Sequence, residues 1–276
     1  MQFARHIPFI HLLGAELLRF EDGESEIALE IRDELEKVEL FVTINDTAAP
    51  PLPPGPDYED FIAGGADVAP DLLAIIDEDT PIVINYTSGT TGKPKGVMCS
   101  HRSTCLHALG EIIETSLTSD AVYLWTLPIF HCNGWGFVWA VTAVGGTHVC
   151  LRHCEPGKIF RLIERERVSH LCAAPNVLLA MVCDPQSVQV KLRRPLQVLT
   201  AGASPSPTIL QGIEDIGANI THVYGLTELH GPHSVCAWQA PWTELDPDAL
   251  TRMKARQGVP YTTSLHMEVV DPITML

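Results

Sequence analysis

The chain has 276 residues, enough for one large or two modest domains, and 46% of them are hydrophobic, so it can bury a core. Its 18 basic and 34 acidic residues give a net charge of −16, which argues against a nucleic-acid partner. The longest apolar stretch, residues 135–144, is far shorter than the roughly 20 residues that a transmembrane helix needs. No apolar secretory signal follows Arg5 and His6, and the eight cysteines lack a repeating spacing, which favours reduced, buried thiols. These features predict a cytoplasmic protein without a transmembrane segment.

The first 80 residues divide into two predicted segments. Residues 7–20 resemble the start of a hotdog-fold thioesterase, so residues 1–36 are interpreted as a fragment of such a domain, although any catalytic acid is absent. Residues 37–80 are interpreted as a connector and a partial N-terminal subdomain. They hold a strand-like run at 38–44, a proline-rich connector at 50–56 that excludes helix and central strand, and a short helix capped by Asp57.

From residue 81 onward, short apolar runs alternate with helical patterns. This alternation predicts a third segment, residues 81–276, with an α/β fold: a mostly parallel sheet with helices on both faces. Ligands of such sheets bind at the carboxyl ends of the strands. The predicted strands are 82–86, 122–127, 147–152, 169–173, 196–200 and 220–223, and the predicted helices are 101–114, 135–144, 157–167, 176–183 and 206–216.

The most informative segment runs from Tyr86 to Gly96. It holds hydroxyl side chains, glycines and two lysines but no carboxylate, which suits the binding of a polyanion through backbone N–H groups and ammonium charge. Lys93 is followed by Pro94, unlike the Walker P-loop, and strand-like runs flank the segment, so a hairpin loop is expected. A surface turn rich in Gly and Thr is the alternative. The surrounding residues 86–103 form a basic island that also includes Lys95, His101 and Arg102.

A second cluster of chemically active residues comprises His148, Cys150, His153 and Cys154. Their spacing raises the hypothesis of a zinc site. However, a strand at 147–151 would point His148 and Cys150 to the same face and leave no second ligand pair nearby, so this hypothesis is not favoured.

Four motifs occur in order along the chain: the loop at 86–96, Leu127–Trp135 (LPIFHCNGW), Thr200–Ser204 (TAGAS) and Tyr224–Glu228 (YGLTE). Together they resemble the adenylate-forming superfamily of acyl-CoA synthetases, adenylation domains and luciferases, and the second motif is most similar to medium- and long-chain fatty acyl-CoA ligases. The resemblance implies the large N-terminal domain of such an enzyme. The later Thr-Gly-Asp motif and the small C-terminal domain with its lysine have no counterpart before Leu276, so a truncated copy is expected.

The resemblance also implies roles for particular residues. Ser88 to Lys93 would hold the β- and γ-phosphates of ATP, Thr87 and Glu228 would bind Mg²⁺, and Thr227 would contact the α-phosphate. Tyr224 and Gly225, with Gly202 and Ala203, would hold adenine, whereas His131 would lie beside the acyl group and Trp135 would gate its tunnel. The implied catalytic residues are Lys93, His131, Thr227 and Glu228, and the implied nucleotide-binding residues are Thr87, Ser88, Gly89, Thr90, Thr91, Gly92, Lys93, Gly202, Ala203, Tyr224, Gly225 and Thr227.

Each of these residues alone has a simpler explanation, such as a solvated carboxylate for Glu228 or a core position for Tyr224. Only the ordered set favours function. His230 and His233, which follow the last motif, are interpreted as structural residues.

The leading hypothesis is therefore ATP-dependent activation of a carboxylic (fatty) acid and its transfer to coenzyme A, with reduced activity in this chain. The partners would be ATP, Mg²⁺, the acid and coenzyme A, and no oligomeric state is predicted. The alternatives are a non-catalytic nucleotide-binding remnant and an acyl-CoA thioesterase, which depends on residues 1–36 alone.

Overall fold

The computed structural model describes residues 55–64, 77–87, 95–187, 190–265, 267–271 and 273–274. The predicted thioesterase-like fragment, the strand at 38–44 and loop residues 88–94 lie outside this set. The chain divides into two compact units, one formed by residues 1–76 and 90–94 and the other by residues 77–89 and 95–276.

The described part of the first unit contains the helix α2, Tyr58–Ala63. The side chain of Asp57 accepts a hydrogen bond from the backbone N–H of Glu59 at 2.9 Å, which satisfies one of the free donors at the helix start. Gly64 caps the other end. The predicted cap of this helix is confirmed.

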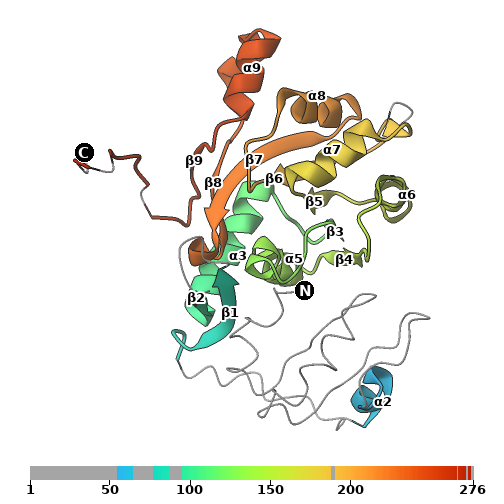
Figure 1. Ribbon diagram of the computed structural model, residues 1–276, viewed down its shortest axis with the longest axis vertical. Coiled ribbons are helices and arrows are strands. Elements are labelled where there is room, and N and C mark those ends of the chain that lie inside the picture. Colours follow the sequence, from blue (N-terminus) through green and yellow to red (C-terminus); the bar gives the residue numbers. More distant parts are fainter. Residues whose placement is uncertain are drawn as a thin grey trace, which may run out of the picture. The chain divides into compact units, whose positions relative to one another are not determined.

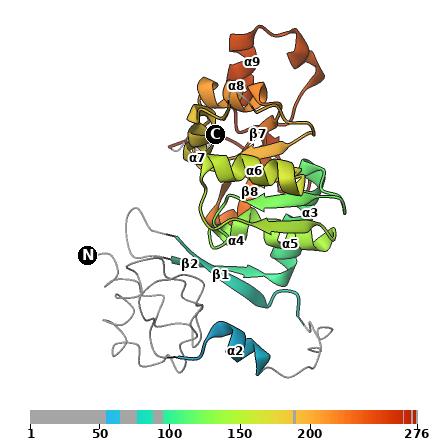
Figure 2. The same ribbon diagram turned by 90° about the vertical axis from the view of Figure 1, so that its right-hand side faces the viewer.

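The second unit is built on a twisted sheet that Figures 1 and 2 show from two directions. Among the described residues seven strands form this sheet, in the order β4-β3-β5-β6-β7-β8-β9. The first five strands are parallel, and β8 and β9 are antiparallel additions at one edge. The α/β prediction is confirmed. The strands are β3 Val122–Trp125, β4 Thr147–Cys150, β5 His170–Cys172, β6 Gln197–Thr200, β7 Asn219–Leu226, β8 Gly231–Val235 and β9 Val259–Pro260.

Helices cover both faces of this sheet. The helices of the second unit are α3 His101–Thr115, α4 Cys132–Trp135, α5 Phe137–Ala143, α6 Pro156–Glu166, α7 Pro175–Cys183, α8 Pro207–Asp215 and α9 Pro247–Lys254, with short 3-10 helices η5 Thr227–Leu229 and η6 Ala240–Glu244. Of these, α9 buries no residue and packs on α8 rather than on the sheet. No described helix is long and apolar enough to cross a membrane.

Successive side chains of β3 show how the two apolar layers arise. Tyr123 and Trp125 are buried in a cluster with residues of α3 and α5, whereas Leu124 is buried in a cluster with residues of α6, α7 and α8. Neighbouring side chains of a strand point to opposite faces, so one strand contributes to both layers. In both views α6, α7 and α8 lie together.

The helix starts explain part of the agreement with the sequence. Pro156 and Pro175 stand at the first positions of α6 and α7, where the missing N–H has no helical partner to lose. The start of α8 was predicted one residue early, because Ser206 is its cap and Pro207 its first residue. The Ser206 side chain accepts from the N–H of Ile209 at 3.3 Å.

The predicted hairpin around the phosphate loop is confirmed at its two strands. β1 (Pro81–Thr87) pairs antiparallel with β2 (Lys95–Ser100), and Thr87 lies opposite Lys95 at the loop end. Ser100 then caps α3 through a reciprocal pair of hydrogen bonds with Ser103. The hairpin therefore leads directly into a capped helix of the main unit.

The predicted helix at 135–144 is wrong at its start. Five consecutive residues, Cys132 to Gly136, have φ between 44° and 80°, and α5 begins only at Phe137. These residues form a left-handed turn, although the first four carry the label α4. Left-handed backbone costs roughly 1–2 kcal/mol for each residue other than glycine, so surrounding contacts must hold this turn.

Two expectations about side chains also need correction. All eight cysteines are free thiols, but Cys105, Cys150, Cys154 and Cys183 are exposed rather than buried. Cys150, for example, is on β4, which is an edge strand. Arg102 of the basic island pairs with Glu78 at 2.7 Å, so part of the positive charge expected there is neutralised.

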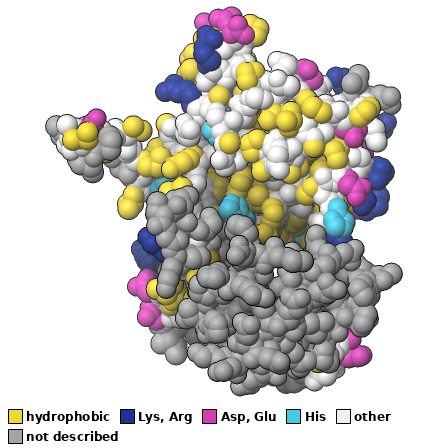
Figure 3. All heavy atoms as spheres, viewed as in Figure 1, with side chains coloured by type: hydrophobic (Ala, Val, Ile, Leu, Met, Phe, Trp, Pro, Cys, Tyr) yellow, Lys and Arg dark blue, Asp and Glu magenta, His cyan; other side chains and the backbone are white. Residues whose placement is uncertain are grey.

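The described surface is mixed in character. Figure 3 shows hydrophobic side chains over much of the visible face, and charged side chains of both signs at the end of the molecule that carries α9. Within that helix, Asp248 lies in the first turn, and Arg252 and Lys254 lie in the last, which complements the helix dipole.

Candidate active site

Three of the four sequence motifs end at one edge of the parallel sheet. Residues 128–134 follow β3, residues 201–204 follow β6 and residues 224–228 include the end of β7. These strands are parallel, so their carboxyl ends lie at the same edge, as the sequence predicted. The motifs thus gather where ligands of such sheets bind.

Strand β1, which leads into the first motif, also contacts this edge of the sheet. The side-chain amide of Asn85 on β1 donates to Oδ1 of Asn133 in the left-handed turn at 2.6 Å. β1 also lies beside η5, which contains Thr227 and Glu228. Two independent contacts therefore join the base of the phosphate loop to the second and fourth motifs. Thr87, at the end of β1, is half-buried, whereas Ser88, Gly89, Thr90, Thr91, Gly92 and Lys93 lie outside the described residues.

The left-handed turn is in direct contact with the last motif. The thiol of Cys132 lies 3.5 Å from Oγ1 of Thr227, and burial raises the pKa of this thiol. The thiol is therefore a neutral partner for the threonine. His131, immediately before the turn, is exposed, and its backbone N–H donates to the carbonyl of Pro128 at 3.1 Å. The turn thus fixes the position of His131 relative to Thr227.

Thr227 and Glu228 begin the single-turn helix η5. The Glu228 side chain is exposed, and no ion pair joins it to any residue in the described ranges. Those ranges contain no group of three or more His, Cys, Asp or Glu side chains placed to hold a metal. Mg²⁺ is commonly held by one or two carboxylates together with substrate phosphates, so an accessible carboxylate on the helix that contacts β1 is suited to this ion.

The predicted adenine-binding residues lie on β7 and the loop after β6. Tyr224 is exposed to 37%, and Gly202 and Ala203 are exposed. Gly202 has φ +85°, and a side chain added there would meet nothing within 4 Å, so this loop presents an open surface. Because β6 and β7 are neighbours, both predicted sides of the ring site lie at adjacent strand ends.

Gly225 has a clear structural reason. A Cβ at this position would lie 1.7 Å from the carbonyl oxygen of Gly231, where β7 and β8 pair around a β-bulge. Only glycine permits this close approach of the two strands. Packing alone therefore explains why residue 225 is a glycine, and its nucleotide-binding role stays a prediction.

Trp135, the predicted tunnel gate, is only 6% exposed and belongs to the apolar cluster that includes Phe137 and Tyr123. Its backbone lies against β8, because a Cβ on Gly231 would come within 3.1 Å of the Cα of Trp135. A gating role for Trp135 stays a prediction, and it would require this buried indole to move.

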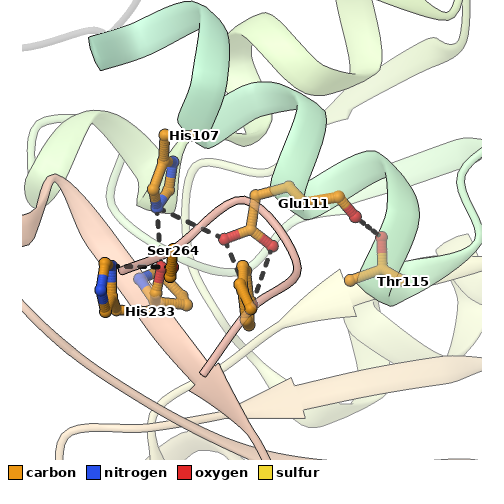
Figure 4. Close-up of polar contacts among 7 residues, drawn as sticks. His107, Glu111, Thr115, His233 and Ser264 are labelled. Carbon is orange, nitrogen blue, oxygen red and sulfur yellow. Dashed lines mark hydrogen bonds and ion pairs between the residues drawn. The ribbon is translucent and has the colours of Figure 1, made fainter. Parts of the chain in front are cut away.

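A buried polar cluster, which the sequence did not predict, lies behind these loops (Figure 4). His107 and Glu111, one turn apart on α3, point toward the loop after β9. His107 Nε2 lies 2.9 Å from the carbonyl oxygen of Pro232 and 3.6 Å from Glu111 Oε1. The hydroxyl of Tyr261 donates to Glu111 Oε2 at 3.2 Å.

Burial determines the protonation of this cluster. Glu111 has no exposed surface, and burial raises the pKa of its carboxyl well above the usual range, so the group is protonated and neutral. Burial lowers the pKa of His107 to about 4, assisted by the nearby His230. A neutral His107 that donates Nε2–H to Pro232 is consistent with the direction of both pKa shifts.

His107 also fills the space between two glycines. A Cβ on Gly136 would lie 2.2 Å from His107 Nδ1, and a Cβ on Gly231 would lie 3.2 Å from its Cε1. The imidazole therefore packs against the left-handed turn and against β8 at once. Both glycines are visible in the sequence, but nothing in their spacing points to a histidine some 30 or 120 residues away.

The sequence model described as "AMP-binding enzyme" matches residues 14–275. This match begins inside the predicted thioesterase-like segment, whose boundary at residue 36 stays a prediction.

Two relatives illustrate the similarity. The chain is 44% identical over 215 residues to 4-hydroxybutyrate–CoA ligase 2 of Metallosphaera sedula, covering 78% of this chain and 39% of the relative. It is 42% identical over 219 residues to the peroxisomal acetate/butyrate–CoA ligase AAE7 of Arabidopsis thaliana, covering 79% and 38%. The chain thus spans about two fifths of the length of these relatives.

A solved structure supports the fold. The inhibitor-bound N-terminal domain of FACL13 from Mycobacterium tuberculosis matches with a TM-score of 0.67 and 24% identity, over 86% of this chain and 60% of that one. The second unit is thus similar in fold to the N-terminal domain of an adenylate-forming enzyme. From the family match over nearly its whole length, the chain belongs to the AMP-binding enzyme family.

Proposed function

We propose that this chain carries the ATP- and magnesium-binding half of an acid–thiol ligase that activates a carboxylic acid as an acyl-adenylate and transfers it to coenzyme A. One observation carries the proposal: β1 contacts both the turn after His131 and the helix η5 with Thr227 and Glu228. This contact supports the assignment of the base of the predicted phosphate loop and the predicted metal ligand to one site.

In the first step, a carboxylate oxygen of the acid attacks the α-phosphorus of ATP, and the bond to the β-phosphate oxygen breaks to release pyrophosphate. Negative charge gathers on the phosphoryl oxygens, so catalysis depends on well-placed donors and on charge. We assign Ser88–Lys93 to the β- and γ-phosphates, Thr227 to the α-phosphate, and Thr87 and Glu228 to Mg²⁺. When bound, the ion neutralises phosphate charge.

In the second step, the thiol of coenzyme A attacks the acyl carbon, and AMP leaves with the electron pair of the broken bond. Tyr224, Gly225, Gly202 and Ala203 would hold the adenine of AMP through this step. His131, exposed beside Thr227, is the side chain we assign to the reacting carboxyl group.

The substrate class we propose is an aliphatic carboxylic acid, of which fatty acids are one kind. The two relatives described above are named for acetate, butyrate and 4-hydroxybutyrate, all of which are short aliphatic acids. The burial of Trp135 also supports the short end of this class, because a long chain would need this indole to move. We further propose a cytoplasmic location on the composition of the chain, although one relative is peroxisomal.

Exchange of radiolabelled pyrophosphate into ATP, measured with the 276-residue chain, Mg²⁺ and butyrate or a longer fatty acid, tests the first step. Removing one preorganised donor from such a site lowers rates by about 10²–10³. Lys93→Ala and Glu228→Gln are therefore expected to reduce exchange at least 100-fold. Lys158→Ala is the matched control, because Lys158 is a partly exposed lysine whose ion pair among the described residues is with Glu155, the residue before α6.

The outcomes separate the alternatives. Exchange that depends on the acid and falls in both variants supports the ligase. Binding of ATP without exchange above the Lys93→Ala level would show a nucleotide-binding remnant instead. If neither ATP binding nor exchange differs between Lys93→Ala and Lys158→Ala, the assignment of the phosphate loop is wrong.

A further inference from the structure

The inference starts from Asn85, a buried polar residue on β1. Only 6% of this residue is exposed. Asparagine is depleted in strands, and a buried amide is costly unless it is hydrogen-bonded, so backbone propensity does not explain this residue. A specific contact of its side chain should therefore explain why it is there.

The side-chain amide of Asn85 has two acceptors. Its Nδ2 lies 2.6 Å from Oδ1 of Asn133 and 3.9 Å from Sγ of Cys99 on β2. An amide nitrogen carries two protons, so it can donate to both acceptors at once. The contact with Asn133 is the shorter one, and it spans 48 residues of sequence to join the hairpin to the left-handed turn.

The backbone offers a simpler explanation for Asn133 alone. Its φ is 44°, and asparagine tolerates positive φ better than most residues other than glycine. This preference does not apply to Asn85, which lies in a strand. The hydrogen bond, by contrast, accounts for both asparagines.

This bond is close to residues that the proposed function assigns to the reaction. His131 precedes the turn, and its carbonyl accepts from the N–H of Gly134 at 2.9 Å, so the turn fixes the backbone of His131. Within the turn, the thiol of Cys132 lies 3.5 Å from Oγ1 of Thr227. A shift of the turn would therefore move His131 relative to Thr227.

The two halves of the turn are held in different ways. In the second half, Gly134 and Gly136 pack so closely that a Cβ at either would come within 2.4 Å of an aromatic ring atom. The first half, residues 132–133, has no glycine. The thiol of Cys132 is a weak hydrogen-bonding group, so the bond between Asn85 and Asn133 is the stronger polar contact there.

We propose that Asn85 is a positioning residue for acyl-adenylate formation. Through its bond to Asn133 it holds the first half of the turn, and with it His131, in register with Thr227. This inference rests on the proposed function and adds to it a pair of residues outside the predicted binding set.

The first measurement is hydrogen exchange of single backbone amides, followed by NMR. Asn85→Val places a good strand former on β1, removes the amide and leaves the sequence of the turn intact. The N–H of Gly134 should then exchange at least about tenfold faster, since tenfold corresponds to about 1.4 kcal/mol, the scale of one hydrogen bond. The N–H of Ala140 in α5, which donates to the carbonyl of Gly136 at 3.0 Å, should exchange at the wild-type rate.

The second measurement is exchange of pyrophosphate into ATP with Mg²⁺ and butyrate. Displacing a catalytic group by about 1 Å can lower a rate by about 10², so Asn85→Val and Asn133→Gly should each lower kcat by about tenfold to 100-fold. The KM for ATP should be unchanged. Asn133→Gly separates positioning from backbone preference, because glycine relieves the positive φ by about as much as the lost hydrogen bond contributes. Its urea midpoint should therefore stay near the wild-type value although kcat falls.

Two further variants serve as controls. If both asparagines act through one bond, the double variant Asn85→Val with Asn133→Gly should be no slower than either single variant. Asn219→Ala is the matched control, because Asn219 is an exposed asparagine at the start of β7, and the motif residues follow the other end of that strand. It should change neither the exchange of Gly134 nor kcat.

Unchanged exchange of Gly134 in Asn85→Val, a wild-type kcat in Asn133→Gly, or losses that multiply in the double variant would each overturn the inference. If Asn85→Val does not fold, Asn133→Gly alone decides between positioning and backbone preference. A wild type without acid-dependent pyrophosphate exchange would instead overturn the proposed function, and the inference with it.

Discussion

Acid should destabilise the fold through His230, and the size of the effect follows from its burial. The pKa of this imidazole is about 4 in the folded chain and 6.5 in an unfolded one, because burial disfavours the charged ring. A lowered pKa stabilises the fold above pH 6.5, and this stabilisation is lost as the pH falls toward 4. Between pH 7 and pH 5, His230 should therefore lower the free energy of unfolding by about 2 kcal/mol.

The assay is urea denaturation at pH 7 and pH 5, followed by circular dichroism. Over this range His230→Gln should lose about 2 kcal/mol less of its free energy of unfolding than the wild type. The difference between the two proteins should be slightly larger than this, because His230 also lowers the pKa of His107. His153→Gln, a change at an exposed loop histidine, should leave the wild-type difference intact. If His230→Gln loses as much stability as the wild type, His230 is already charged or solvated and the argument from burial is wrong.

Other substitutions test the packing and the caps, each by urea denaturation. Gly225→Ala should destabilise the fold by at least about 3 kcal/mol, because its methyl group would collide with the backbone of Gly231, whereas Gly202→Ala faces open space and should lose only about 1 kcal/mol; equal losses would contradict the contact. Glu111→Gln should gain stability relative to the wild type as the pH rises from 5 to 8, because burial raises the pKa of Glu111 and its carboxyl is then ionised in the unfolded chain but not in the folded one. A stability difference between variant and wild type that stays constant over this range would mean that the buried carboxyl is ionised. Ser100→Ala should lose about 1 kcal/mol through the α3 cap, and no loss would show that the cap contributes nothing.

Much of the fold could be predicted because local patterns and tertiary contacts agree there. The strands at 122–125 and 197–200 are short apolar runs, and Pro156 and Pro175 mark helix starts, so the parallel sheet follows from the alternation. The last strands could not be predicted in the same way. β8 contains Gly231 and Pro232 and pairs with a two-residue β9, and neither has the apolar run that identifies a strand.

The residues of the candidate site could likewise be predicted only in part. Thr227 and Glu228 could be proposed from the sequence because their motif is local, and their role stays a prediction that the contact of β1 with η5 supports. His107 could not be found, since it reaches the loops across more than 100 residues through a contact with Pro232. The left-handed turn was also missed, because Cys132 and Trp135 rarely adopt positive φ and only the packed neighbours make them do so.

The left-handed turn at 132–136 has a consequence for the folding of the molecule and for its local opening. Gly134 and Gly136 permit this conformation, but Cys132 and Trp135 oppose it, so the turn as a whole depends on its contacts with helix α3 and strand β8. The turn should therefore form late in folding and open early in unfolding. Its amide protons should exchange with deuterium sooner than those of the adjoining α5. A free peptide copied from this stretch would be a poor mimic of it, since the neighbours that impose the shape would be missing.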